Sequence, residues 1–268
     1  MMTLLLAALL LQEAAPTDKE GEAAAHKLRE DAAKASIEGK IAAIHEALKT
    51  EHERVIKVVG EMLVTEADPV RIAGANALGA VDHPASADVL VAAIAPNLHR
   101  EEVMPAIFKA IGELGWQSAV KTLNDLVPKV GEPEVRAILP PALTALGQLG
   151  SLSSVEPLTE LLMKLENGAR RNPWPNEGAM RRNAEEALRQ ITGQSFNKVT
   201  AWDPWWRENK DALQAKLIRV YWNRKTQTRL DVAPGEKTPA DSILVAARLH
   251  PSPSAAGDTT AKKKKKLK

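Results

Sequence analysis

The chain has 268 residues and an apolar content of 44%, enough for one sizeable core or a short stack of repeats. Aromatic residues make up only 3%, whereas Ala and Leu, which are strong helix formers, dominate the apolar set. There is no cysteine, which excludes disulfides, thiolate metal sites and cysteine nucleophiles, and the composition predicts an all-α protein.

The first residues resemble a secretory signal. Leu4 to Leu11 form a continuous apolar run, far shorter than the membrane span of about 20 residues. No Lys or Arg precedes the run and no A-x-A cleavage site follows it, so a short apolar helix packed on the first repeat is the alternative. Residues 1–16 are predicted to be a signal peptide and the protein to be periplasmic or otherwise exported, with a cytoplasmic location as the alternative. No other segment could cross a membrane.

Residues 17–49 are rich in Ala, Glu and Lys and predict one or two helices with solvated charged faces.

After them, four segments share one apolar pattern: 70–81, 103–114, 138–149 and 180–191. Counted from the first residue of each segment, large or small apolar residues recur at offsets 0, 4, 7, 8 and 11, which is one face of a helix. Offset 7 is alanine in all four: Ala77, Ala110, Ala145 and Ala187. A small residue there allows a neighbouring helix to approach closely.

Helices of a second kind are expected between these segments, at 53–64, 84–95, 116–127 and 151–162. The unit is therefore a helix hairpin, repeated after 33, 35 and 42 residues when counted between the alanines of offset 7. Four units in register at this spacing favour a stack of hairpins over the alternative, an ordinary helix bundle.

The segment ADPVRIAGANALGAVDHPASADVLVAAI (67–94) resembles a bacterial HEAT repeat. Its matches to the family pattern D-P-x-V-R-x-x-A-x-x-A-L-G are Asp68, Pro69, Val70, Arg71, Ala77, Leu78 and Gly79. Arg71 has a counterpart in Arg181, but Met104 and Leu139 replace it in the middle repeats. The resemblance covers residues 50–193. It implies a right-handed α-solenoid in which the second helix of each hairpin lines a concave side, and a role as a protein-binding scaffold.

The last repeat is interrupted by a predicted loop, NGARRNPWPNEG (167–178), which contains an Asn-Gly pair and two prolines. Solenoid loops often carry binding residues, and this one displays Arg170, Arg171 and Trp174. The alternative is a simple connector in which Trp174 packs on the next hairpin. The residues proposed to contact a partner are Arg71, Arg170, Arg171, Trp174 and Arg181.

Residues 194–217 predict a helix that starts at Asp203-Pro204 and carries an aromatic cluster. The cluster is expected to cap the apolar end of the last repeat, as Trp-rich segments do in similar bacterial HEAT proteins, with a stacking platform for sugar, peptide or base as the alternative. Residues 218–250 are left without an assigned fold. Within them, Val220 and Trp222 alternate with polar residues as in a short strand, and the range 239–249 favours a last helix.

Residues 251–268 predict a disordered Lys-rich tail. Its lysines are Lys262, Lys263, Lys264, Lys265, Lys266 and Lys268. Subtracting these six charges from the net charge of +2 leaves −4 for the rest, so the body lacks the basic footprint of a nucleic-acid binder. The tail is either a solubilising extension or a contact for a polyanion, such as nucleic acid, anionic lipid or cell-wall polymer.

No motif of catalysis stands out. The six histidines have no metal-ligand spacing, and P-loop, Rossmann and G-x-S-x-G patterns are missing. The sequence therefore predicts a monomeric scaffold that binds another protein, without a catalytic site, metal or cofactor.

Overall fold

The computed structural model describes residues 17–168, 174–223, 228–234, 236–237, 239 and 242–249. Within these residues the fold is mainly helical, with one small sheet. The helices are α1 (Asp18–Lys34), α2 (Ile37–Leu48), α3 (Glu53–Thr65), α4 (Asp68–Gly79), α5 (Pro84–Ile94), α6 (Met104–Leu114), α7 (Ser118–Leu126), α8 (Pro133–Leu149), α9 (Val155–Gly168), α10 (Glu177–Thr192) and α11 (Trp202–Gln214). The strands are β1 (Ile218–Asn223), β2 (Thr228–Val232) and β3 (Ser242–Arg248).

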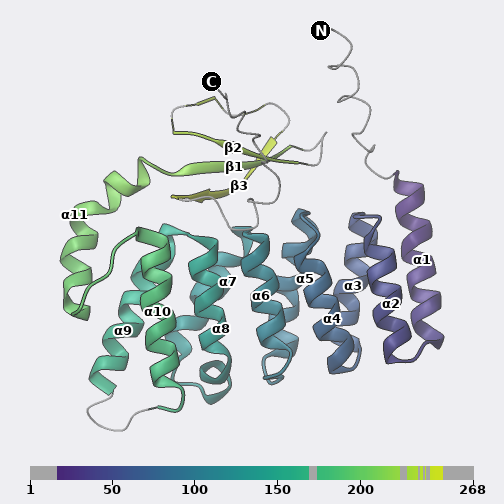
Figure 1. The fold of residues 1–268 in the computed structure, drawn as a ribbon, viewed down its shortest axis with the longest axis horizontal. Helices are drawn as coiled ribbons and strands as arrows, with labels where there is room; N and C mark the ends of the chain where they lie inside the picture. The colour runs from purple at the N-terminus through teal and green to yellow at the C-terminus, as the bar shows by residue number, and fades with distance from the viewer. Residues whose placement is uncertain are drawn as a thin grey trace, which may run out of the picture.

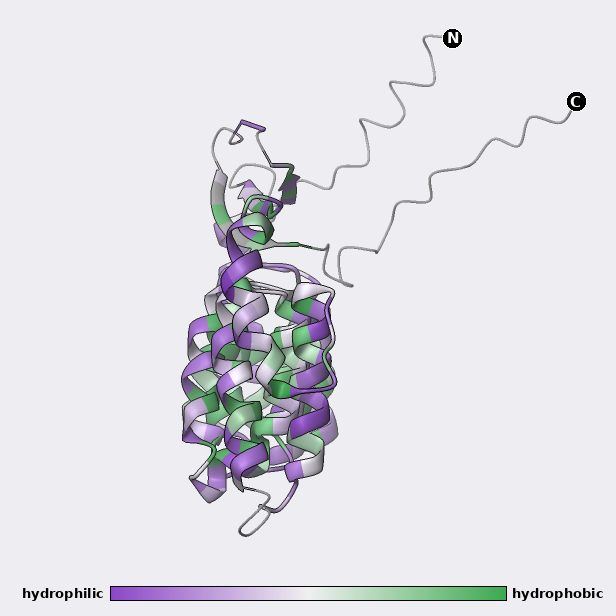
Figure 2. Cartoon of the chain, turned by 90° about the vertical axis from the view of Figure 1, so that its left-hand side faces the viewer, coloured by the Kyte–Doolittle hydropathy of each residue, from purple (hydrophilic) through white to green (hydrophobic). Residues whose placement is uncertain are grey.

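Helices α1 to α10 stand side by side in one row (Figure 1). Consecutive helices pack as pairs, and each helix from α1 to α6, together with α8, also packs on the next but one, so that the row has two layers. We call α1, α3, α5, α7 and α9 the first-helix layer, and α2, α4, α6, α8 and α10 the second-helix layer. Seen along the row from the α11 end, the two layers stand side by side and the strands lie above the helix ends (Figure 2).

Each helix predicted for the repeats is present, and the apolar offsets explain why. The residues at offset 0, Val70, Val103, Ile138 and Met180, are all buried between the layers. The helix boundaries differ from the predicted ones by a few residues, most of all in α9, which runs from Val155 to Gly168; α8 begins at Pro133 and so has an extra turn.

Glycine recurs at offset 9 of α4, α6 and α8, at Gly79, Gly112 and Gly147. Each faces the alanine of offset 7 in the next helix of the layer. A Cβ added at Gly79 would lie 2.9 Å from Ala110 Cβ, and one added at Gly147 would lie 2.9 Å from Ala187 Cα. The prediction that the alanine column permits close approach is confirmed, and the glycine column supplies the other half of each contact. In α10 the same offset holds the exposed Arg189, and no further second-layer helix follows within the described residues.

We expect Gly147→Ala to destabilise the fold by about 1–2 kcal/mol, because the overpacking at Ala187 outweighs the gain in helix propensity of about 1 kcal/mol. Gly178→Ala in α10 is the matched control, since its nearest neighbour is the flexible Arg182 guanidinium at 3.5 Å. Urea unfolding of both variants checks this. A Gly147→Ala protein as stable as the control would contradict the close contact between α8 and α10.

Helix α11 follows the row and carries most of the aromatic cluster. Trp202 and Trp206 are only 2% and 9% exposed, and Trp206 Nε1 donates a hydrogen bond to Glu156 Oε1 of α9 at 3.2 Å. The Phe196 ring meets the Trp202 ring edge-on, with centroids 4.8 Å apart. The buried rings of Trp202 and Trp206 therefore have no open face on which a ligand could stack.

The C-terminal part departs from the all-α prediction. The predicted strand around Val220 and Trp222 is present as β1, the centre of an antiparallel sheet of order β2-β1-β3. The predicted last helix in 239–249 is wrong, because Ser242–Arg248 forms β3 and pairs along the full length of β1. Pairing with β1 and the hydrogen bond from Gln117 to Ala247 O decide the structure of this segment.

Candidate functional site

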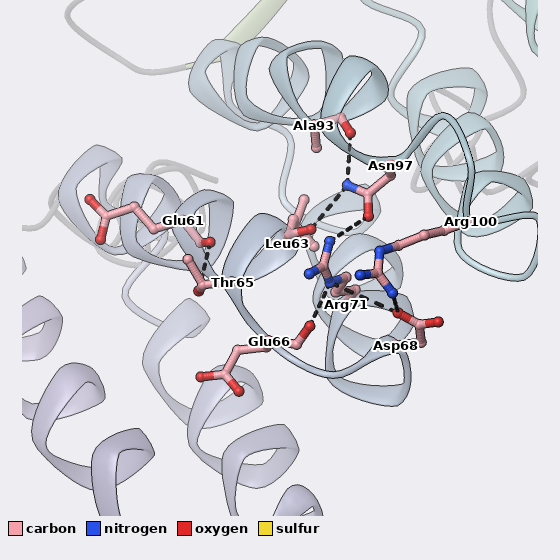
Figure 3. Close-up of polar contacts among 9 residues, drawn as sticks. All are labelled: Glu61, Leu63, Thr65, Glu66, Asp68, Arg71, Ala93, Asn97 and Arg100. Carbon is pink, nitrogen blue, oxygen red and sulfur yellow. Dashed lines mark hydrogen bonds and ion pairs between the residues drawn. The ribbon is translucent and has the colours of Figure 1, made fainter.

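Arg71, one of the predicted contact residues, lies inside the row and is only 5% exposed. Its Nε donates to Glu66 O at 2.5 Å and its Nη1 to Asn97 Oδ1 at 2.8 Å (Figure 3). Asn97 Nδ2 in turn donates to Leu63 O at 3.0 Å and Ala93 O at 2.8 Å. This network joins the end of α3, α4 and the short helix η1 (Ala95–Asn97), and it leaves Arg71 little surface for a partner.

Charges surround the outer side of this network. Arg100 Nη1 lies 2.5 Å from Asp68 Oδ1, and Lys40 Nζ lies 2.6 Å from Glu66 Oε2. Desolvation by burial, followed by the nearby Arg100, lowers the pKa of Arg71, although a guanidinium stays protonated in proteins. The arrangement is a satisfied structural network with no group poised for proton transfer.

Trp174 and Arg181 lie close together at the other end of the row. Arg181 Nη2 is 4.0 Å from Glu177 Oε1, and the Trp174 amide donates to Glu177 Oε2 at 3.2 Å. The Arg136 guanidinium stacks over the Trp174 ring at 5.6 Å from its centroid. Because α6 and α8 separate α4 from α10 within their layer, Arg71 does not share a site with these residues. Arg170, Arg171 and the lysines of the tail lie outside the described residues.

The sheet is attached to the row by an aromatic junction that the sequence did not reveal. The Trp222 ring of β1 lies 5.4 Å from the Trp116 ring and 5.7 Å from His83, both edge-on. The Arg229 guanidinium of β2 lies over Trp116 at 4.6 Å, and its Nε is 2.9 Å from Asp82 Oδ1. The junction thus ties β1 and β2 to the loops after α4 and α6.

Two polar groups complete the junction. Gln117 Nε2 donates to Ala247 O of β3 at 3.1 Å. His83 Nδ1 accepts from the Ala85 amide at 3.1 Å and so caps the start of α5, and burial lowers the pKa of His83. These partners are far apart in sequence, so no local pattern could have predicted them.

The outward side of the second-helix layer carries few charges along the middle turns of α4, α6 and α8. We call it the second-helix face. It consists of residues on the side opposite the core: Ile72, Ala73, Asn76, Pro105, Lys109, Ala137, Pro140, Pro141 and Thr144. Asn76, Pro105, Lys109 and Thr144 are exposed and the others half-buried. Asn76 and Thr144 are polar but uncharged, and Lys109 is the one charged residue of the nine. It pairs at 3.8 Å with the exposed Glu113 one turn further along α6, and Glu134 and Arg136 border the face at the start of α8.

The first-helix layer looks different. Its outward side carries exposed charges along α3 and α7, including Glu53, Lys57, Lys121 and Asp125, which form ion pairs along their own helices. The sequence already contained a signal for this contrast. Offsets 2, 3 and 6 of the first three repeats, which lie on the outward side of the second helices, hold uncharged residues apart from Lys109.

The α8 part of the second-helix face contains two prolines inside a helix, Pro140 and Pro141. A proline there costs about 3 kcal/mol, because it removes a hydrogen bond and crowds the preceding turn. Polar side chains gather beside it: Asn183 Nδ2 of α10 donates to Pro140 O at 2.8 Å and lies 3.2 Å from Thr144 Oγ1. Local rules are expected to be broken in this way at functional or strained sites.

Among the described residues no cluster of His, Asp and Glu could hold a metal ion. In that same part of the chain, no helix is long and apolar enough to cross a membrane. A shallow pocket of about 170 Å³ lies between α1 and α2, with apolar Ala and Leu side chains and the charged Lys27, Asp31 and Glu46 around it. No protein-family model matches the chain, and no curated protein matches it.

Proposed function

We propose that the protein is a non-catalytic scaffold that binds another protein through the second-helix face. In this proposal the two-layered row is a right-handed solenoid of HEAT-type hairpins. Support comes from the paired packing of α3 to α10, from the alanine and glycine columns at their contacts, and from the HEAT-like pattern at 67–94.

The observation that carries the proposal is the difference in charge between the two layers. The cores of protein interfaces are depleted of charged residues, because each buried charge must be desolvated. The second-helix face has one charged residue among nine, with Glu113, Glu134 and Arg136 at its edges, whereas the outward sides of α3 and α7 in the first-helix layer carry ion pairs. A broad, shallow surface of this kind suits a protein partner better than a small molecule.

The rest of the proposal follows from the sequence alone. The protein works as a monomer without cofactor, and the apolar run Leu4–Leu11 directs it out of the cytoplasm.

Charge insertion on each layer tests the proposed face. Asn76→Glu with Pro105→Glu adds two negative charges to the second-helix face, and we expect it to abolish recovery of the partner by the tagged chain from its native host. Ala92→Glu with Ser118→Glu adds the same charge to exposed positions of the first-helix layer and should leave recovery unchanged. Circular dichroism checks that both variants fold. Equal recovery by the two variants, or loss only in the first-layer variant, would remove the second-helix face as the binding surface.

A further inference from the structure

The two prolines of α8 leave two backbone carbonyls without their helical donors. In a regular helix the amide of residue 140 would donate to Arg136 O, and that of residue 141 to Ala137 O. Proline has no N–H, so neither bond can form. Within the described part of the helical row, no hydrogen bond reaches either oxygen from another element.

Regular helix geometry places these oxygens at the edge of the second-helix face. A helix carbonyl points toward the residue four positions later, so Arg136 O lies beside Pro140 and Ala137 O beside Pro141. All four residues are half-buried, which places the pair at the surface but in a sheltered position. Ala137, Pro141, Thr144 and Gln148 form one stripe at spacings of three and four residues, along the outward side of α8.

The surrounding contacts hold this acceptor pair in place but do not satisfy it. Asn183 Nδ2 and Thr144 Oγ1 both donate to Pro140 O and not to Arg136 O or Ala137 O. Pro140 O can also accept the helical hydrogen bond from the amide of residue 144. Asn183 thereby fixes α8 to α10 one turn away from the two carbonyls. The Arg136 side chain is drawn toward the Trp174 ring.

We propose that Arg136 O and Ala137 O bind the backbone amides of an extended segment of the partner protein. The inference rests on the proposed function, because it names the kind of partner that the second-helix face takes. Two adjacent acceptors need two donors, and the low charge of the face disfavours a Lys or Arg side chain as their source. An extended peptide supplies N–H groups at regular intervals.

The test compares two proline variants. The double variant Pro140→Ala with Pro141→Ala restores both helical amide donors, so that both carbonyls are hydrogen-bonded within α8. It should also raise the melting temperature of the protein. A raised melting temperature excludes misfolding as the reason for lost binding. Pro105→Ala is the matched control, because this proline lies in the first turn of α6, where an amide has no helical acceptor. Random peptides of about 12 residues, long enough to cross three helices when extended, are displayed and selected on the wild-type protein.

We expect selected peptides to bind the double variant about tenfold more weakly and Pro105→Ala as tightly as the wild type. Methylation of one peptide amide nitrogen should cause a similar loss with the wild type and no further loss with the double variant. Three results would overturn the inference: equal enrichment on the wild type and the double variant, an equal loss of binding with Pro105→Ala, or no enrichment of any peptide. The last result would mean that water alone solvates the carbonyls. Any of these outcomes, together with loss of the partner after charge insertion at Asn76 and Pro105, would leave the proposed function standing.

Discussion

Replacing Asn97 with alanine is expected to lower the free energy of unfolding by about 3 kcal/mol or more. Asn97 is fully buried, and its amide satisfies two carbonyls and the Arg71 guanidinium at once. Without it, Leu63 O loses its side-chain donor and the buried Arg71 keeps only Glu66 O at hydrogen-bonding distance. Chemical unfolding in urea measures the loss.

Arg100→Ala is the control for this prediction. It removes an ion pair with Asp68 that is about 40% exposed on the Arg100 side, and exposed pairs contribute less than about 1 kcal/mol. If Asn97→Ala and Arg100→Ala destabilised the protein equally, the network around Arg71 would not be a major stabilising element of the fold.

Trp222→Ala should detach the sheet from the row. The Trp222 ring is 5% exposed and fills the space beside Trp116 and His83, so its removal costs about 3–5 kcal/mol locally. Hydrogen exchange should show lost amide protection in β1, β2 and β3, whereas α3 and α4, which lie outside the junction, should keep theirs.

Trp222→Phe serves as the comparison, because it retains an aromatic ring against Trp116 and should lose much less protection. Unchanged protection of β1 to β3 in Trp222→Ala would mean that Arg229 and Gln117 suffice to hold the sheet. A uniform loss across the whole chain would instead show that the sheet and the row unfold together.

The helices could be predicted because their pattern is local. Offsets 0, 4, 7, 8 and 11 lie within one segment, and the Asp68-Pro69 start is a short-range signal. The strand β3 could not be predicted, since its conformation depends on pairing with β1 about twenty residues earlier and on a junction with the row.

The burial of Arg71 could not be predicted from the sequence either. A buried arginine and a partner-binding arginine look alike in a sequence, and the difference here depends on Asn97, which lies one repeat away. For Trp174, one of the two interpretations was packing on the next hairpin, but its ring stacks with Arg136 of α8, which belongs to the preceding hairpin. The offsets of the second-helix face, uncharged apart from Lys109, were visible in the sequence, but only the layered packing shows that they share one surface.

Site-specific photo-cross-linking in the native host tests the binding face most directly. A benzoylphenylalanine is placed at Asn76 or Thr144 on the second-helix face, and at Ala92 or Ser118 on the first-helix layer, all of them exposed positions. The proposal predicts that Asn76 and Thr144 give an adduct with one and the same protein, and that Ala92 and Ser118 do not. Adducts formed only from Ala92 and Ser118, or the same adducts from all four positions, would contradict it.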